Sequence, residues 1–348
     1  MSRAQLTSTV EQNTGGAVAP FLAGKNKIIN GDYSIWQRGT TFSPTSAAQI
    51  YLADRWCIYQ NGSGTFTVSQ QAFDYSASPA ADKLPITGYN PAYFTRLAIT
   101  TLGTTSAFEY EQKIEDVKTF ANQTVTISFW GKSPTSSGIS FYYRQNFGSG
   151  GSSNVQGPTQ GFTLTTSWQR FSYTVTLGTI VGKTIGAGNN LEIIFNAGIG
   201  ANQTWDIWGV QVEAGSVATP FTTASGTVQG ELALCQRYYY RMTNTTSDGY
   251  GVFAFGSATS STSATFYITL PVTMRTSPTL IDTVVSNLRW ADASVASTFT
   301  SFVHTDTPSS PNLIALQGLG SSGLTPYRPT WLQGNGVTTA YLGFGAEL

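Results

Sequence analysis

The most informative segment of the sequence is NKIINGDYSIWQRG, residues 26–39, followed across a polar loop by Asp54-Arg55-Trp56. Apolar and polar residues alternate through Ile28–Tyr33 and again through Ser34–Arg38, and such alternation predicts two short strands. The Asn30-Gly31 pair is a turn signal, and Gly39 ends the second run. We therefore expect the first folded domain to begin here, with strands.

The composition extends this expectation to the whole chain. A length of 348 residues suits two domains. Only 10% of the residues are charged, against about 25% in an average globular protein. Aromatic residues reach 13%, which a disordered chain would lack. Short alternating runs of Thr, Ser, Tyr, Phe and Val between Gly-rich turns predict an all-β protein.

Charge and cysteine content exclude several classes of function. The net charge is zero, and no cluster of Lys and Arg is present that would bind nucleic acid. Cys57 and Cys235 have no CxxC spacing, and the chain has one His, so we expect no metal site and no cofactor. Two buried thiols are the expected state, with a disulfide between them as the alternative. No apolar run is long enough to span a bilayer, and residues 1–16 lack a signal-peptide core, so we expect synthesis and folding in a cytoplasm.

The chain divides into an arm and two domains. Residues 1–25 are polar apart from Pro20-Phe21-Leu22, and they are either a frayed terminus or a docking arm that uses these three residues as its anchor. We prefer the arm. Regularly spaced strands over residues 26–224 predict a jelly-roll-like β-sandwich. The small and polar stretch 214–230 indicates a linker. We expect a second β-sandwich domain over residues 225–348.

Five motifs resemble a β-sandwich domain of bacteriophage tail-fibre and other virion proteins, which is similar to carbohydrate-binding jelly rolls. They are N-x-I-I-N-G-D-x-x-I-W-Q-R-G-T-x-F (26–42), Y-x-x-D-R-W (51–56), T-V-T-x-S-F-W-x-K (124–132), E-x-x-x-C-Q-R-Y-Y (231–239) and P-V-x-M-R-x-x-P (271–278). The resemblance implies a virion structural protein, forming a homotrimer and contacting other tail or capsid proteins. The acidic pair of calcium-binding jelly rolls is missing, because Trp208 and Gly209 stand before Val210, so calcium is not carried over.

Signals for catalysis are weak. Glu109 and Glu111 alternate with aromatic residues in one predicted strand, which places both carboxylates on one face about 7 Å apart. Glycoside hydrolysis uses such a pair, but any E-x-E strand supplies the spacing. The sole histidine, His304, has no G-x-S-x-G partner motif, so we expect no enzyme activity.

Strand alternation predicts a binding face. Val125, Ile127 and Phe129 should face the core, and the same count applies to Ile139–Arg144 and Trp168–Leu177. If these strands share one sheet, its outer face carries an aromatic and cationic set: Trp130, Tyr142, Arg144, Trp168 and Arg170. Such a face either stacks on sugar rings or is buried against a neighbouring subunit.

The sequence thus predicts a tail-fibre or receptor-binding component of a virion, assembled in the host cytoplasm and attached by its arm. It would contact host glycan through its sandwich domains, without membrane insertion. The alternatives are a capsid-surface fibre or decoration protein and, less favoured, a glycan-cleaving tailspike.

Overall fold

The computed structural model describes residues 24–43, 49–76, 86, 90–105, 107–197, 202–292, 295–304, 309–320 and 322–348. The fold is all-β, as predicted, with one α-helix, α2 (Val228–Gln236), and one 3-10 turn, η1 (Val285–Asn287), in the described residues. The chain forms two compact units, residues 1–231 with Leu348 and residues 232–347. No helix in the described ranges has the length and apolarity needed to cross a membrane.

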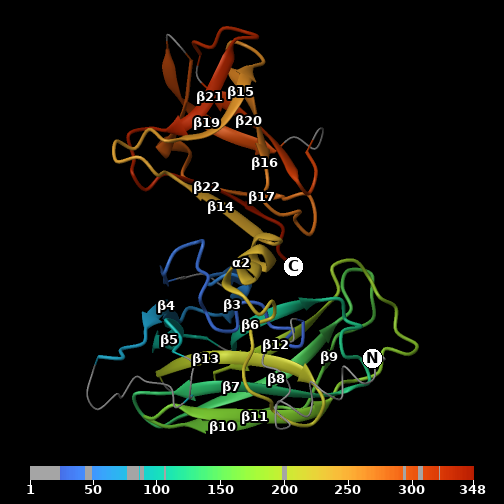
Figure 1. Ribbon diagram of the computed structural model, residues 1–348. Helices are drawn as coiled ribbons and strands as arrows, with labels where there is room; N and C mark the ends of the chain where they lie inside the picture. The colour runs from blue at the N-terminus through green and yellow to red at the C-terminus, as the bar shows by residue number, and fades with distance from the viewer. Residues whose placement is uncertain are drawn as a thin grey trace, which may run out of the picture. The chain divides into compact units, whose positions relative to one another are not determined.

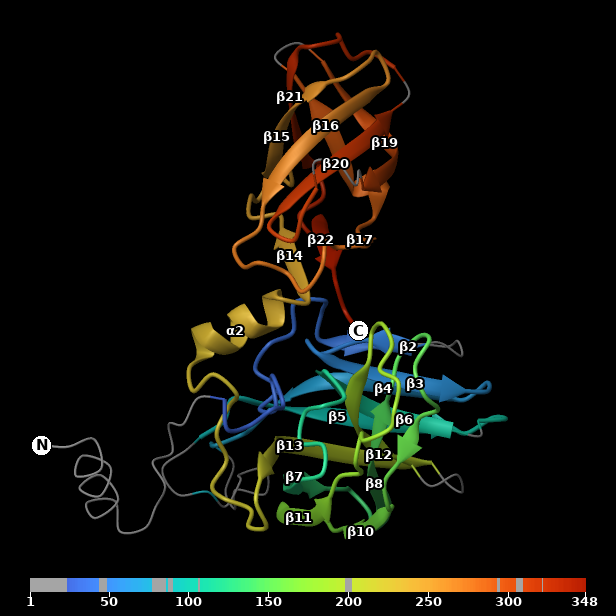
Figure 2. The ribbon, with the colours of Figure 1, turned by 90° about the vertical axis from the view of Figure 1, so that its right-hand side faces the viewer.

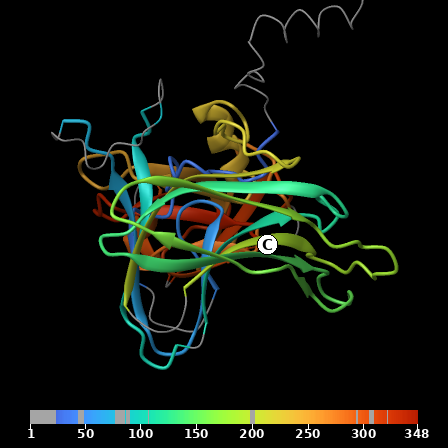
Figure 3. The same ribbon diagram turned by 90° about the horizontal axis from the view of Figure 1, so that it is seen from below.

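The first unit is a sandwich of two antiparallel sheets (Figures 1 and 3). The six-stranded sheet has the order β1 (Thr41–Phe42), β4 (Thr65–Ala72), β5 (Tyr93–Thr101), β13 (Gln203–Ala214), β7 (Thr124–Lys132), β11 (Gln169–Thr176). The seven-stranded sheet has the order β10 (Gln160–Leu164), β8 (Ser137–Asn146), β12 (Asn190–Asn196), β6 (Ala107–Glu115), β3 (Trp56–Asn61), β2 (Gln49–Tyr51), and β9 (Val155–Gln156) pairs with β8.

The core between the sheets follows the predicted alternation. Val125, Ile127 and Phe129 of β7 are at most 1% exposed and pack against the inward residues of β8 and β12. Ring pairs fill much of this space, and Trp56 stacks on Tyr110 with 5.0 Å between ring centroids. Burial of such large apolar surfaces is the main force that holds the two sheets together.

The stretch 26–39 forms turns, so the prediction of two strands there is wrong. Asn30 lies in the left-handed region at φ 56°, and its side chain accepts a hydrogen bond from the Ile35 amide at 2.9 Å. The same side chain donates to the carbonyls of Ile35, at 2.8 Å, and Asp54, at 3.0 Å. Hydrogen bonds from a side chain to nearby backbone compete with strand pairing. Here the bonds of Asn30 connect the stretch 26–39 to the motif Asp54-Arg55-Trp56.

The Asn-Gly turn docks on an irregularity in β13. The register between β13 and β7 shifts between Trp208 and Gln211, at Gly209, which has φ 67°. As a result Ile207 and Val210, three residues apart, both face the core. The Val210 amide donates to the carbonyl of Gly31 at 2.9 Å, and a Cβ at Gly31 would lie 2.2 Å from the Val210 oxygen. Only glycine fits at this close approach.

The second unit is a closed barrel with a small sheet (Figure 2). The barrel has the order β15 (Val252–Ala258), β16 (Ser263–Thr269), β20 (Leu313–Gly320), β19 (Ala296–His304), β18 (Leu288–Ala291), β21 (Pro329–Gly334). The small sheet has the order β14 (Tyr239–Thr243), β22 (Tyr341–Gly345), β17 (Leu280–Asp282). We predicted a second sandwich here. The strands instead close on themselves, an outcome that alternation alone does not distinguish from two packed sheets. Cys57 and Cys235 are both buried, as predicted.

Candidate functional site

The five predicted binding residues do not share one face. β7 and β11, with Trp130 and Arg170, belong to the six-stranded sheet, whereas β8, with Tyr142 and Arg144, belongs to the seven-stranded sheet. Trp168 lies just before β11. The prediction of a shared face is therefore wrong, because alternation assigns a residue to a side of its strand and not to a sheet.

The outer face of the six-stranded sheet is covered by the chain itself. Trp168 and Trp208 form an aromatic cluster with Phe73 and Phe94, and Trp208 packs against Phe221 at 4.7 Å between ring centroids. Arg170 donates to the Ser128 hydroxyl at 3.0 Å and to the carbonyl of Thr219. The stretch that the sequence indicated as a linker thus packs on this face, and Trp130, Trp168 and Arg170 contribute to its packing.

The outer face of the seven-stranded sheet carries a charged cluster at its centre. Arg144 of β8 donates to Glu109 of β6 at 2.7 Å, lies 3.5 Å from Glu111 of β6, and donates through Nε to Glu192 of β12. Tyr142 donates its hydroxyl to Glu109. Three neighbouring strands therefore hold one guanidinium in a fixed orientation, with a quarter of the Arg144 side chain exposed.

Burial and neighbouring charges shift the pKa values of ionisable groups in this cluster. Burial, and after it the nearby charge of Glu192, raise the pKa of Glu111 from 4.5 to about 7. Burial alone would lower the pKa of Arg144, but its ion pairs with Glu192 and Glu109 outweigh that effect and raise the pKa above its ordinary value. Arg144 therefore stays charged at any ordinary pH, while Glu111 takes up a proton near neutrality.

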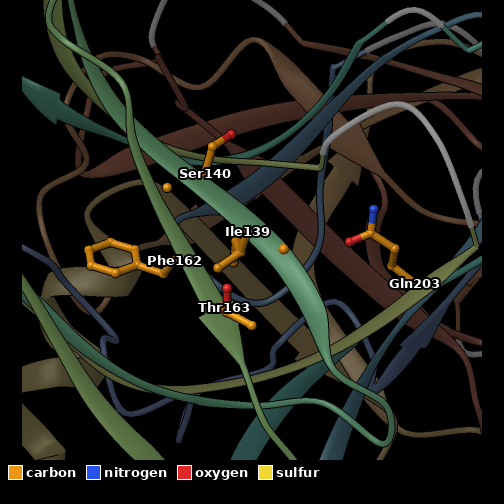
Figure 4. Close-up of a pocket in the computed structure, with 7 residues that line it drawn as sticks. Ile139, Ser140, Phe162, Thr163 and Gln203 are labelled. Carbon is orange, nitrogen blue, oxygen red and sulfur yellow. The ribbon is translucent and has the colours of Figure 1, made fainter.

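A hollow of about 400 Å³ is lined by β8, β10 and Gln203 of β13 (Figure 4). Gly138 and Ser140 of β8 stand opposite Thr163 and Gly161 of β10 in direct register. A Cβ added at Gly138 or Gly161 would meet no atom within 4 Å, so the two glycines leave this part of the face open. The lining contains no charged residue: Gly138, Ile139, Ser140, Gly161, Phe162, Thr163 and Gln203. Ile139 and Phe162 lie on the core side of these strands, and Gln203 begins β13 of the other sheet, so the hollow lies at the β10 edge of the sandwich.

The sequence also singled out a pair of carboxylates and three docking residues. Glu109 and Glu111 do lie on one face, but both carboxylates are less than a tenth exposed and both contact Arg144. Across the part of the chain that the structure describes, no group of three or more His, Cys, Asp and Glu side chains could hold a metal ion. The docking residues Pro20, Phe21 and Leu22 lie outside the described residues.

Sequence reasoning missed the hollow. In the sequence, Gly138 and Gly161 resemble ordinary turn or loop residues. They form an open part of the surface only because β8 and β10 pair. Isolated glycines inside a strand pattern often mark close approach of another molecule or backbone, and that signal was available.

No family model matches the chain, and no curated protein is significantly similar to it. Solved structures are similar over about half of this chain at TM-scores below 0.5, which carry no functional assignment. A CBM4 structure is 24% identical, with a TM-score of 0.32, and the match covers 53% of this chain and 98% of that one. The enzymatically active domain of tailspike protein 4 from bacteriophage CBA120 is 16% identical, with a TM-score of 0.35, over 57% of this chain and 22% of that one. The family 11 carbohydrate-binding module from Clostridium thermocellum, bound to a β-1,3-1,4-mixed-linked tetrasaccharide, is 13% identical, with a TM-score of 0.31, over 52% and 98%.

Proposed function

We propose that this protein is a bacteriophage virion protein, a tail-fibre or receptor-binding component, that binds glycan in the hollow at the β10 edge of its sandwich. The observation that carries the binding proposal is this hollow, whose described lining is uncharged. The virion setting is supported by the sequence motifs and by no other observation. A capsid-surface or decoration protein with the same module is the alternative.

The chemistry of the hollow suits a sugar ring. Ser140 and Thr163 present hydroxyl groups, and Gln203 presents an amide, while the half-buried Phe162 supplies apolar surface. A pyranose offers the complementary groups, since it has hydroxyls at its rim and C–H groups on its faces.

The proposal includes no catalysis. Hydrolysis needs one carboxyl to reach the glycosidic oxygen and a second to reach the anomeric carbon or its water. Glu109 and Glu111 are buried and bound to Arg144, so neither carboxylate faces an open bond. Incubation of the protein with host polysaccharide should release no reducing ends, and release that Glu109→Gln or Glu111→Gln abolishes would favour the tailspike alternative.

The binding proposal is tested by filling the hollow. Gly161→Leu places a side chain where no atom lies within 4 Å of the new Cβ, so the fold should tolerate it. We expect the affinity of the full-length protein for host-surface polysaccharide to fall at least tenfold, or by about 1.4 kcal/mol. The matched control is Ser172→Leu on β11, an exposed position of the other sheet, which should leave affinity unchanged.

Three results would contradict parts of the proposed function. A wild-type protein that binds no glycan of the host surface removes the glycan role. Equal weakening by Gly161→Leu and Ser172→Leu places binding elsewhere. Binding to virions without any block of phage adsorption by the free protein would favour the decoration alternative over a receptor-binding role.

A further inference from the structure

In the part of the chain that the structure describes, β11 is paired on one side only and ends the six-stranded sheet (Figure 2). The other terminal strands of the two sheets are shorter: β1 has two residues, β2 three and β10 five, whereas β11 has eight. The pairing of β11 with β7 is regular, without a bulge, and β11 contains neither proline nor lysine. Proteins protect edge strands with such features, because an unprotected edge pairs with another strand.

The one charged residue of β11 does not protect this edge either. The Arg170 guanidinium donates to the Ser128 hydroxyl at 3.0 Å and to the carbonyl of Thr219. It is therefore turned back over the outer face of its own sheet, and the edge itself carries no charge.

The core of the first unit is incompletely covered along the same edge. Phe171, Tyr173 and Val175 alternate on the core face of β11, and all three are half-buried where they pack against the core. The residues opposite them on β7 are at most 1% exposed. One more strand beside β11 would remove the exposed parts of these three side chains from water, which is favourable.

Alternate residues of β11 direct their backbone N–H and C=O groups away from the sheet. The Leu177 amide donates to the carbonyl of Gln123, and the Gly215 amide donates to the carbonyl of Thr124. In an antiparallel pair these directions alternate along the strand, so residues 169, 171, 173 and 175 bond to β7 and the residues between them face outward. Across the described residues, no hydrogen bond reaches the backbone groups of these outward residues: Arg170, Ser172, Thr174 and Thr176.

We propose that a second copy of the chain pairs with this edge, β11 against β11 in antiparallel orientation, about a twofold axis at Tyr173. In this register Ser172 lies opposite Thr174 of the second copy, and Arg170 lies opposite Thr176 of the second copy. Each of these pairs joins two outward-facing residues. Every unpaired N–H and C=O of the two edges therefore gains a partner, which gives about eight new hydrogen bonds.

The side chains of β11 fit the same register. On the core side, Phe171 meets Val175 of the second copy and Tyr173 meets its own equivalent, and aromatic and β-branched pairs of this kind stabilise antiparallel strands. On the outer side, Ser172 meets Thr174, and Arg170 has no like charge opposite it. The edge is thus complementary to itself, as an isologous twofold interface requires.

The proposed assembly is a dimer, so it differs from the homotrimer that the sequence resemblance implies. It also does not rest on the proposed glycan site, because oligomeric state and glycan affinity are measured separately.

The test is sedimentation equilibrium of the full-length protein, which should give a dimer at concentrations up to about 0.1 mM. Thr174→Pro removes an outward N–H from each copy and places a ring in the path of the second strand, so the dissociation constant should rise about tenfold or more. Ser172→Leu is the matched control, because it keeps every backbone N–H of the exposed edge and should leave the dimer intact. An unchanged circular dichroism spectrum will show that the variants fold.

Disulfide formation tests the register in chains that keep every backbone donor. Ser172→Cys mixed with Thr174→Cys, oxidised with glutathione disulfide, should form an intermolecular disulfide, because directly opposite residues have Cα atoms about 5.5 Å apart. Either variant alone should form none, since its two cysteines lie diagonally across the interface. The native Cys57 and Cys235 are buried. A monomeric or trimeric wild type overturns the proposal, as does a dimer that a folded Thr174→Pro leaves intact, the absence of the mixed disulfide, or a disulfide in either variant alone.

Discussion

Glu111 should make the first unit less stable as the pH rises, and Glu111→Gln should remove that dependence. The carboxyl is 3% exposed, and its pKa is about 7 in the folded protein against 4.5 in the unfolded chain. A raised pKa means that the folded state holds the proton more tightly, so this contribution is complete below pH 4.5 and is lost as the pH rises through 7.

The magnitude follows from the two pKa values. One pKa unit corresponds to about 1.36 kcal/mol, so the full contribution is about 3 kcal/mol, of which about 2.5 kcal/mol disappears between pH 5 and pH 8. Glutamine has the same shape and does not ionise. Relative to the wild type, Glu111→Gln should therefore gain about 2.5 kcal/mol in the free energy of unfolding over this interval.

The assay is urea unfolding at pH 5 and pH 8, followed by the fluorescence of the buried Trp56 and Trp205 in the core of the first unit. Asp32, whose pKa burial raises to about 6, titrates in both proteins, and its contribution cancels in the comparison. Glu192→Gln removes a charge that raises the pKa of Glu111, so it should weaken the pH dependence without abolishing it. A stability difference between wild type and Glu111→Gln that is the same at both pH values would refute the reasoning.

Two further substitutions, each followed by urea unfolding, test polar interactions that stabilise the sandwich. Arg96→Met leaves the fully buried Asp206 without its bidentate partner, whose hydrogen bonds are 2.7 and 2.8 Å long, and should lower the free energy of unfolding by about 3–5 kcal/mol. The double variant Arg96→Met, Asp206→Leu should recover most of this loss. A loss below 1 kcal/mol would mean that Lys132, 3.8 Å from Asp206, suffices. Asn30→Ala removes three hydrogen bonds to backbone and places alanine at φ 56°, so it should cost about 4 kcal/mol or more. Asn30→Gly, which tolerates the angle, should cost about 1 kcal/mol less, and an equal loss for both would remove the conformational part of the argument.

The class of fold and the identity of many core residues could be predicted from the order of the residues. A period of two in Thr124–Lys132 and in Ile139–Arg144 marks which side chains avoid water, because successive residues of a strand point to opposite faces. Val125, Ile127 and Phe129, and likewise Ile139, Phe141 and Tyr143, are buried as that period requires. The charged pair Glu109 and Glu111 was likewise placed on one face.

The sheet that each strand joins, and the residues that cover each face, became known from the three-dimensional structure. β7 and β8 are neighbours in sequence but enter opposite sheets, and pairing between distant strands depends on the packing of the whole domain. Phe221 and Thr219 read as linker residues, yet they cover the outer face of the six-stranded sheet. The Arg144 cluster combines three strands, and the hollow depends on the pairing that sets Gly138 opposite Thr163 and Gly161 opposite Ser140, so neither could be predicted from spacing along the chain.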